Sequence, residues 1–125
     1  MGKLSERLND PARSGVYRAT DASVVRSAAP RAAEVDLARP VFEAFASALS
    51  FADWFGHNWD ALEDCLTEKS GVLLLHNARQ GDELALLVDV LAAVAEYWRD
   101  EGEPFFAVFV DPERRLALPD LFREA

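Results

Sequence analysis

The sequence has a single cysteine, Cys65, so an internal disulfide bond is excluded. An unpaired thiol fits a reducing cytoplasm. No apolar run approaches the roughly 20 residues that a helix needs to span a bilayer, and the first residues lack the apolar segment of a secretory signal. No Gly-rich loop precedes a helix, so a phosphate cradle is not predicted. We therefore expect a cytoplasmic protein that neither enters nor crosses a membrane.

Positive charge is scarce in most of the chain. The 125 residues carry a net charge of −9, and the imbalance is uneven. Residues 1–33 contain six Lys or Arg and three acids, whereas residues 34–125 contain seven Lys or Arg and nineteen acids. An acidic body repels nucleic-acid phosphates and attracts a basic protein. Acidity that only maintains solubility is the alternative explanation.

Apolar runs alternate with segments of helical periodicity, which predicts a small α/β domain over residues 33–110. The continuous apolar runs are typical of buried parallel strands. We expect a three-stranded parallel sheet covered by helices. The strands are expected at 33–37, 72–76 and 105–110, and the helices at 40–49, 58–67 and 82–101.

Two flanking segments are less regular. Residues 1–32 form an N-terminal lead-in whose order the sequence leaves open. Within it, residues 15–18 are a candidate short strand, and residues 22–28 a candidate short helix capped by Asp21. Residues 111–125 form a polar C-terminal tail, with leucines that can pack back onto the body.

The helix expected over residues 58–67 has an acidic face and an apolar face. At 100° per residue the acidic face carries Asp60, Glu63, Asp64 and Thr67, and the apolar face carries Trp59, Leu62 and Leu66. Like charges four residues apart, such as Asp60 and Asp64, oppose each other by about 0.2–0.5 kcal/mol. No Lys or Arg follows until Lys69. The face is either an ordinary solvated surface or a ridge of anions that binds a cationic partner.

The segment before this helix adds aromatic surface. Trp54, Phe55, His57 and Trp59 lie within six residues, too many for the core of so small a domain. Helical phase assigns Trp59 to the core, so we expect Trp54 or Phe55 to be partly exposed, as aromatic anchors of binding sites are. Asn58 is the expected N-cap of the helix. Gly56 suits a backbone position with positive φ or a close approach by a partner.

Catalysis and metal binding are weaker hypotheses. Cys65 and His57 are eight residues apart, about 12 Å along a helix, which is too far for a nucleophile and its base. His76, at the end of a strand, is expected to be structural. Three carboxylates on one exposed helix could hold a hard cation weakly, but they lack the enclosing ligands of a dedicated site. We expect no enzyme activity, no bound metal and no cofactor.

Residues 54–67 read Trp-Phe-Gly-His-Asn-Trp-Asp-Ala-Leu-Glu-Asp-Cys-Leu-Thr. This segment resembles the signature of the barstar family: an aromatic pair followed by Gly-x-Asn-x-Asp-Ala-Leu-x-Asp-Cys-Leu-Thr. The match has no gap, and the order of the later strands and helices also resembles that of the family. The resemblance covers roughly residues 33–110.

The resemblance implies three strands in simple 1-2-3 order and a protein that inhibits a basic, guanyl-preferring microbial ribonuclease stoichiometrically. It implies that Asp64 enters the enzyme's phosphate-binding site and that Asp60 pairs with a second cation nearby. The surrounding contacts would come from Trp54, Phe55, Gly56, Asn58 and Thr67. The inhibitor would be a monomer when free.

The chain departs from the family pattern at the rim of this surface. Glu63 stands where the type member has an exposed Trp. Near the end of the last helix, Glu101 matches one of two acidic contact residues, and Tyr97 replaces the other. These differences leave an alternative open, in which the same fold serves as an interaction or immunity module against an unrelated toxin or partner.

Overall fold

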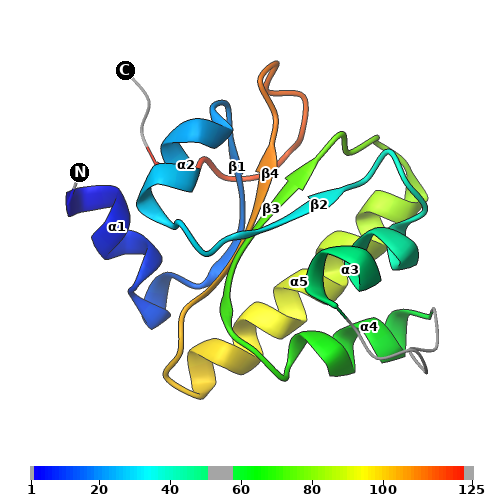
Figure 1. Ribbon diagram of the computed structural model, residues 1–125, viewed down its shortest axis with the longest axis horizontal. Helices are drawn as coiled ribbons and strands as arrows, with labels where there is room; N and C mark the ends of the chain where they lie inside the picture. The colour runs from blue at the N-terminus through cyan, green and yellow to red at the C-terminus, as the bar shows by residue number, and fades with distance from the viewer. Residues whose placement is uncertain (1, 51–57, 123–125) are drawn as a thin grey trace.

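The computed structural model describes residues 2–50 and 58–122 (Figure 1). In chain order the elements are α1 (Gly2–Leu8), the short 3-10 helix η1 (Pro11–Arg13), β1 (Gly15–Ala19), α2 (Ala22–Ala28), β2 (Ala33–Asp36), α3 (Val41–Leu49), α4 (Trp59–Leu66), β3 (Gly71–His76), α5 (Asp82–Asp100) and β4 (Phe105–Val110). None of the helices in these residues is long and apolar enough to cross a membrane.

The strands form one parallel sheet in the order β1-β4-β3-β2. The predicted α/β class and the side-by-side order of β2, β3 and β4 are confirmed. The predicted number of three strands is wrong, because β1 adds a fourth strand beside β4, from Gly15 opposite Phe106 to Ala19 opposite Val110. The sequence pattern indicated a short strand here but could not place it, since its partner lies at the other end of the chain.

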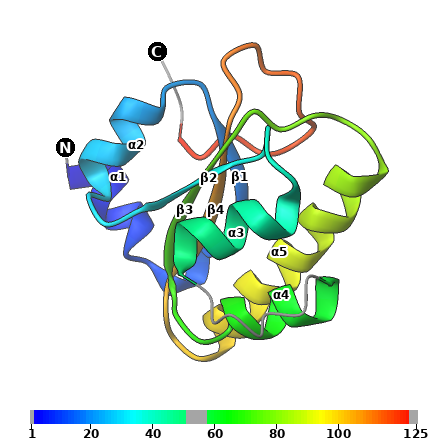
Figure 2. The same ribbon diagram turned by 45° about the vertical axis from the view of Figure 1, so that its right-hand side comes forward.

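Helices cover both faces of the sheet (Figures 1 and 2). On one face, α1 and α2 bury Leu8 and Val25 against alternate residues of β3 and β4, such as Leu74 and Val108. On the other face, α3, α4 and α5 pack on the intervening residues, such as Leu75. β4 is covered on both faces, which explains why Phe105 to Phe109 are all buried.

The predicted helix positions are confirmed. Side-chain N-caps explain where two of the helices, α2 and α4, begin. The carboxylate of Asp21 accepts the backbone N–H of Ser23 at 2.9 Å at the start of α2. The side-chain oxygen of Asn58 accepts the backbone N–H of Ala61 at 2.8 Å at the start of α4. At the end of α3, Ser50 takes the left-handed conformation with φ of 54°.

The C-terminal tail packs against the outer edge of β1. The backbone of Arg18 donates to the carbonyl of Pro119 and accepts from the N–H of Leu121, each at 2.9 Å. The Arg18 guanidinium also pairs with Asp120 at 2.8 Å. Leu116 and Leu121 are buried. The described part of the tail is therefore integral to the fold, and it covers a strand edge that would otherwise be open.

Candidate partner-binding face

The helix α4 separates an apolar side from an acidic one. Leu62 and Leu66 are buried in the main core. Asp60, Glu63 and Asp64 are exposed on the other side of the helix. This is the division that the 100° helical period predicts.

Trp59 and Thr67, at the two ends of the helix, are intermediate in exposure. Trp59, expected in the core, is only partly buried and packs edge-on against Phe42 of α3, with ring centroids 4.9 Å apart. The expectation for Trp59 was therefore partly wrong, because the first turn of α4 lies at the margin of the core.

Hydrogen bonds hold both ends of α4. At the first turn, Asn58 provides the cap described above. At the last turn, the indole Nε1 of Trp98 in α5 donates to the carbonyl of Leu66 at 3.0 Å. The hydroxyl of Thr67 donates to the backbone carbonyl of Asp64 at 2.8 Å. Asn58 and Thr67, predicted as contact residues, therefore have structural roles, because their hydrogen bonds hold the backbone of the helix that carries the acidic side chains.

The acidic side of α4 has no internal counter-charge in the described part of the chain. There, no Lys, Arg or His lies within salt-bridge distance of Asp60, Glu63 or Asp64. Other carboxylates of the protein are paired: Glu34 with Arg26, for example, at 2.7 Å. Three exposed anions on less than two turns of helix repel each other and attract cations.

The C-terminal end of α5 lies beside the C-terminal end of α4 (Figures 1 and 2). Glu101 is the C-cap of α5 and is exposed. Tyr97, one turn earlier, is 43% exposed and packs edge-on against Trp98, with ring centroids 5.1 Å apart. An exposed aromatic side chain and an exposed carboxylate therefore lie at the end of α5, where Trp98 is hydrogen-bonded to α4.

Three of the predicted contact residues, Trp54, Phe55 and Gly56, lie outside the described residues. His57 does too, so the argument that it cannot act on Cys65 stays a prediction. Cys65 itself is partly buried, and burial, followed by the nearby carboxylates of Glu68 and Asp64, raises the pKa of its thiol. A raised pKa disfavours the thiolate that nucleophilic catalysis requires.

A second polar cluster, which the sequence did not indicate, joins α2 to the sheet. The carboxylate of Glu34 accepts two hydrogen bonds from Arg26, at 2.7 and 2.8 Å, and lies 2.8 Å from Nε2 of His76. The hydrogen bonds from Arg26, together with those from His76, lower the pKa of Glu34 to about 2. His76 is thus paired within the fold, as expected of a structural residue.

No group of three or more His, Cys, Asp or Glu side chains in residues 2–50 and 58–122 is arranged to hold a metal ion. The three carboxylates of α4 are included in that statement. The exposed carboxylates of α4 can attract cations electrostatically.

Comparison with known protein families matches residues 25–110 to the family described as barstar (barnase inhibitor). The matched region includes β2 to β4 and helices α3 to α5, and it contains the whole of α4. Searches of the curated proteins and of the solved structures gave no significant match.

Proposed function

Because the chain belongs to the barstar family of barnase inhibitors, we propose that it inhibits a basic microbial ribonuclease by covering the active site with the acidic side of α4. The family consists of inhibitors and not of enzymes. The observation that carries the proposal is that Asp60, Glu63 and Asp64 are exposed and have no cationic partner in the described part of the chain.

Asp64 is the residue we assign to the phosphate-binding site of the enzyme. A ribonuclease binds RNA phosphates with cationic side chains, and a carboxylate on a fixed helix can replace a phosphate among them. Asp60, one turn earlier on the same side of α4, would pair with a second cation. Thr67 and Asn58 support this assignment because their hydrogen bonds hold the helix that carries both acids.

The net charge of −9 supports a fast encounter with a basic enzyme. Charges outside the direct contact steer the approach, and salt screens them. Glu101, exposed at the end of α5, is assigned to the rim. Trp54, Phe55 and Gly56 are proposed as further contacts. With a single cysteine in the sequence, we propose that the protein acts in the cytoplasm, as a monomer before it binds the enzyme.

The test compares Asp64→Ala with the unaltered protein in titrations against a barnase-type ribonuclease. Asp64→Ala should weaken binding by at least about 2 kcal/mol, or about thirtyfold, mainly through faster dissociation. Asp89→Ala, which removes an exposed carboxylate from α5, is the matched control and should leave dissociation unchanged. Urea denaturation of each variant shows whether the fold is intact.

Glu101→Ala separates steering from direct contact. Its effect should fall chiefly on the association rate and should shrink as salt concentration rises. If Asp64→Ala inhibits as well as the unaltered protein, or unfolds the domain, the acidic side of α4 is structural and the proposal fails. If the unaltered protein binds a secreted toxin of another kind and no basic ribonuclease, the chain is an immunity module for a different target.

A further inference from the structure

One side of α5 carries a row of apolar side chains that are open to solvent. Leu86 and Tyr97 are 49% and 43% exposed, Ala93 is exposed, and Val90 is partly exposed. At 100° per residue these four side chains lie within about 60° of one another around the helix axis, and the row is about 16 Å long. We call these four residues the α5 seam.

The α5 seam is separate from the side of the helix that packs on the sheet. The core-facing residues Leu87, Leu91 and Val94 are at most 2% exposed, and they lie about 100° further around the helix. Successive seam residues are four, three and four positions apart. This is the spacing of apolar residues along the contact between two packed helices. The seam therefore has the pattern of a surface on which a second helix can lie.

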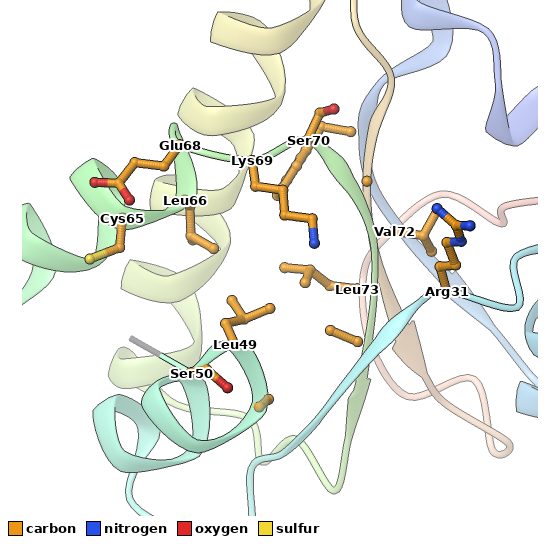
Figure 3. A pocket seen from close by; sticks show the side chains of 14 residues that line it. Arg31, Leu49, Ser50, Cys65, Leu66, Glu68, Lys69, Ser70, Val72 and Leu73 are labelled. Atoms are coloured by element: carbon orange, nitrogen blue, oxygen red, sulfur yellow. The ribbon is translucent and has the colours of Figure 1, made fainter. Parts of the chain in front are cut away.

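A cavity of about 680 Å³ at the C-terminal ends of α3 and α4 is a different feature (Figure 3). Leu66 and Leu73, which line it, are at most 5% exposed, so its apolar lining belongs to the core. Among the described residues, those of α5 do not line this cavity. The seam is thus an exposed apolar surface of its own.

Exposed carboxylates border the seam on both sides. By the same helical geometry they are Asp82, Asp89 and Asp100 on one border and Glu83 and Glu101 on the other. None of these five makes an ion pair within residues 2–50 and 58–122. Arg99, the one cation of α5, lies on another side of the helix, where it donates to the carbonyl of Ser14 at 3.2 Å. The seam is therefore framed by negative charge alone.

These charges determine what can cover the seam. Two copies of α5 laid against each other would bring like charges together along both borders, which opposes self-association. A partner helix with Lys or Arg beside its own apolar row would instead pair opposite charges along both borders. The same contact would remove the exposed parts of Leu86 and Tyr97 from water. Charge complementarity therefore favours a cationic partner over a second copy of this chain.

From these observations we propose that the α5 seam binds a cationic amphipathic helix of a partner protein. The partner helix lies along α5, with its apolar row on the seam and its Lys or Arg side chains toward the bordering carboxylates. The small side chain of Ala93, in the middle of the row, leaves room for a large apolar side chain of the partner. The proposal does not depend on the ribonuclease assigned to α4, because Asp60 and Asp64 take no part in this contact.

The first experiment measures the binding of three labelled peptides to the full-length protein by fluorescence anisotropy at low salt. The first peptide, of about 18 residues, has leucines at alternating three- and four-residue spacing and lysines elsewhere, so that it forms an amphipathic helix longer than the seam. It should bind saturably, and added salt should weaken its binding. The second has the same composition in scrambled order, and the third has Glu in place of Lys. Both should bind at least about tenfold more weakly, because they lose the apolar row or the charge pairing.

The second experiment uses paired variants of neighbouring alanines. Ala92 and Ala93 are both exposed on α5, but Ala92 lies about 120° around the helix from the seam. Ala93→Gln should weaken binding of the first peptide about three- to tenfold, since its polar side chain would have to be buried. Leu86→Gln should weaken it by a similar factor, because about half of that side chain is left to be buried by the partner. Ala92→Gln should leave binding unchanged, and glutamine is a good helix former at each position.

The proposal is overturned if the scrambled or the acidic peptide binds as tightly as the first, or if Ala92→Gln weakens binding as much as Ala93→Gln. Asp64→Ala tests whether the peptide binds to α4 instead. If that variant weakens peptide binding as much as Leu86→Gln does, the peptide occupies the acidic side of α4 and the proposal fails. It also fails if the free protein dimerises in sedimentation experiments and Ala93→Gln abolishes the dimer, because a second copy then covers the seam. None of these measurements involves ribonuclease inhibition, so this proposal and the proposed function can fail separately.

Discussion

Asp111 holds the C-terminal tail against the sheet, and we expect its replacement to destabilise the protein. It follows β4 directly and is only 6% exposed. Its carboxylate accepts the backbone N–H of Arg115 at 3.0 Å and that of Leu116 at 2.8 Å. The backbone carbonyl of Asp111 also accepts the N–H of Arg114 at 3.1 Å, which closes the turn through Pro112.

The loss of unfolding free energy expected for Asp111→Ala follows from the two hydrogen bonds that the Asp111 carboxylate accepts. A hydrogen bond to a charged group contributes about 1.5–3 kcal/mol net. Asp111→Ala leaves the buried N–H of Leu116 without a partner, whereas water can reach the partly exposed N–H of Arg115. The total loss should therefore be about 3 kcal/mol. Asp111→Asn keeps one acceptor oxygen and should lose about half as much.

The measurement is urea denaturation at pH 7, followed by circular dichroism. Glu113→Ala is the matched control, because Glu113 lies in the same turn and its ion pair with Arg115 is at the surface. That variant should have the same urea midpoint as the unaltered protein. If Asp111→Ala also has that midpoint, the tail is not held by Asp111, and the reasoning from its two backbone contacts is refuted.

Three further changes test other parts of the structure. Asn58→Ala removes the acceptor of the Ala61 N–H and should lower the free energy of unfolding by about 1 kcal/mol in urea denaturation; an unchanged midpoint would show that the cap contributes nothing. Glu34→Gln should destabilise the protein above pH 4.5, because Arg26 lowers the pKa of Glu34 from 4.5 to about 2 when the chain folds. The difference in stability should disappear as the pH falls from 4.5 toward 2, and a difference that grows instead would contradict this linkage. Cys65 should react with iodoacetamide much more slowly in the folded protein than in urea, since burial raises its pKa; equal rates would contradict it.

Local patterns in the sequence were sufficient for the central part of the fold. The expected helix over 40–49 is observed as Val41–Leu49, and the expected strand over 72–76 as Gly71–His76. Both depend on periodicity or on a continuous apolar run, which are properties of neighbouring residues. The acidic side of α4 was predictable for the same reason, because the angle between Asp60 and Asp64 depends only on helical geometry.

Features that depend on distant residues could not be predicted in this way. The place of β1 is decided by β4, far along the sequence, so a five-residue pattern could not reveal it. The hydrogen bond from Trp98 to Leu66 and the cavity at the C-terminal ends of α3 and α4 each join segments that the sequence keeps apart. The partial exposure of Trp59 also depends on where the core ends, and not on its phase in the helix.

The order of the strands has a consequence for synthesis on the ribosome. β4 is the last strand to be made, yet it occupies an interior position and pairs with β1 on one side and β3 on the other. β1 is made before β2 and β3, and its hydrogen-bonding partner β4 is made only after both of them. Contacts so far apart along the chain slow folding. A nascent chain that stops before Phe105 therefore has two strands able to pair, β2 and β3, and exposes on β3 the edge and apolar side chains that β4 covers in the finished protein.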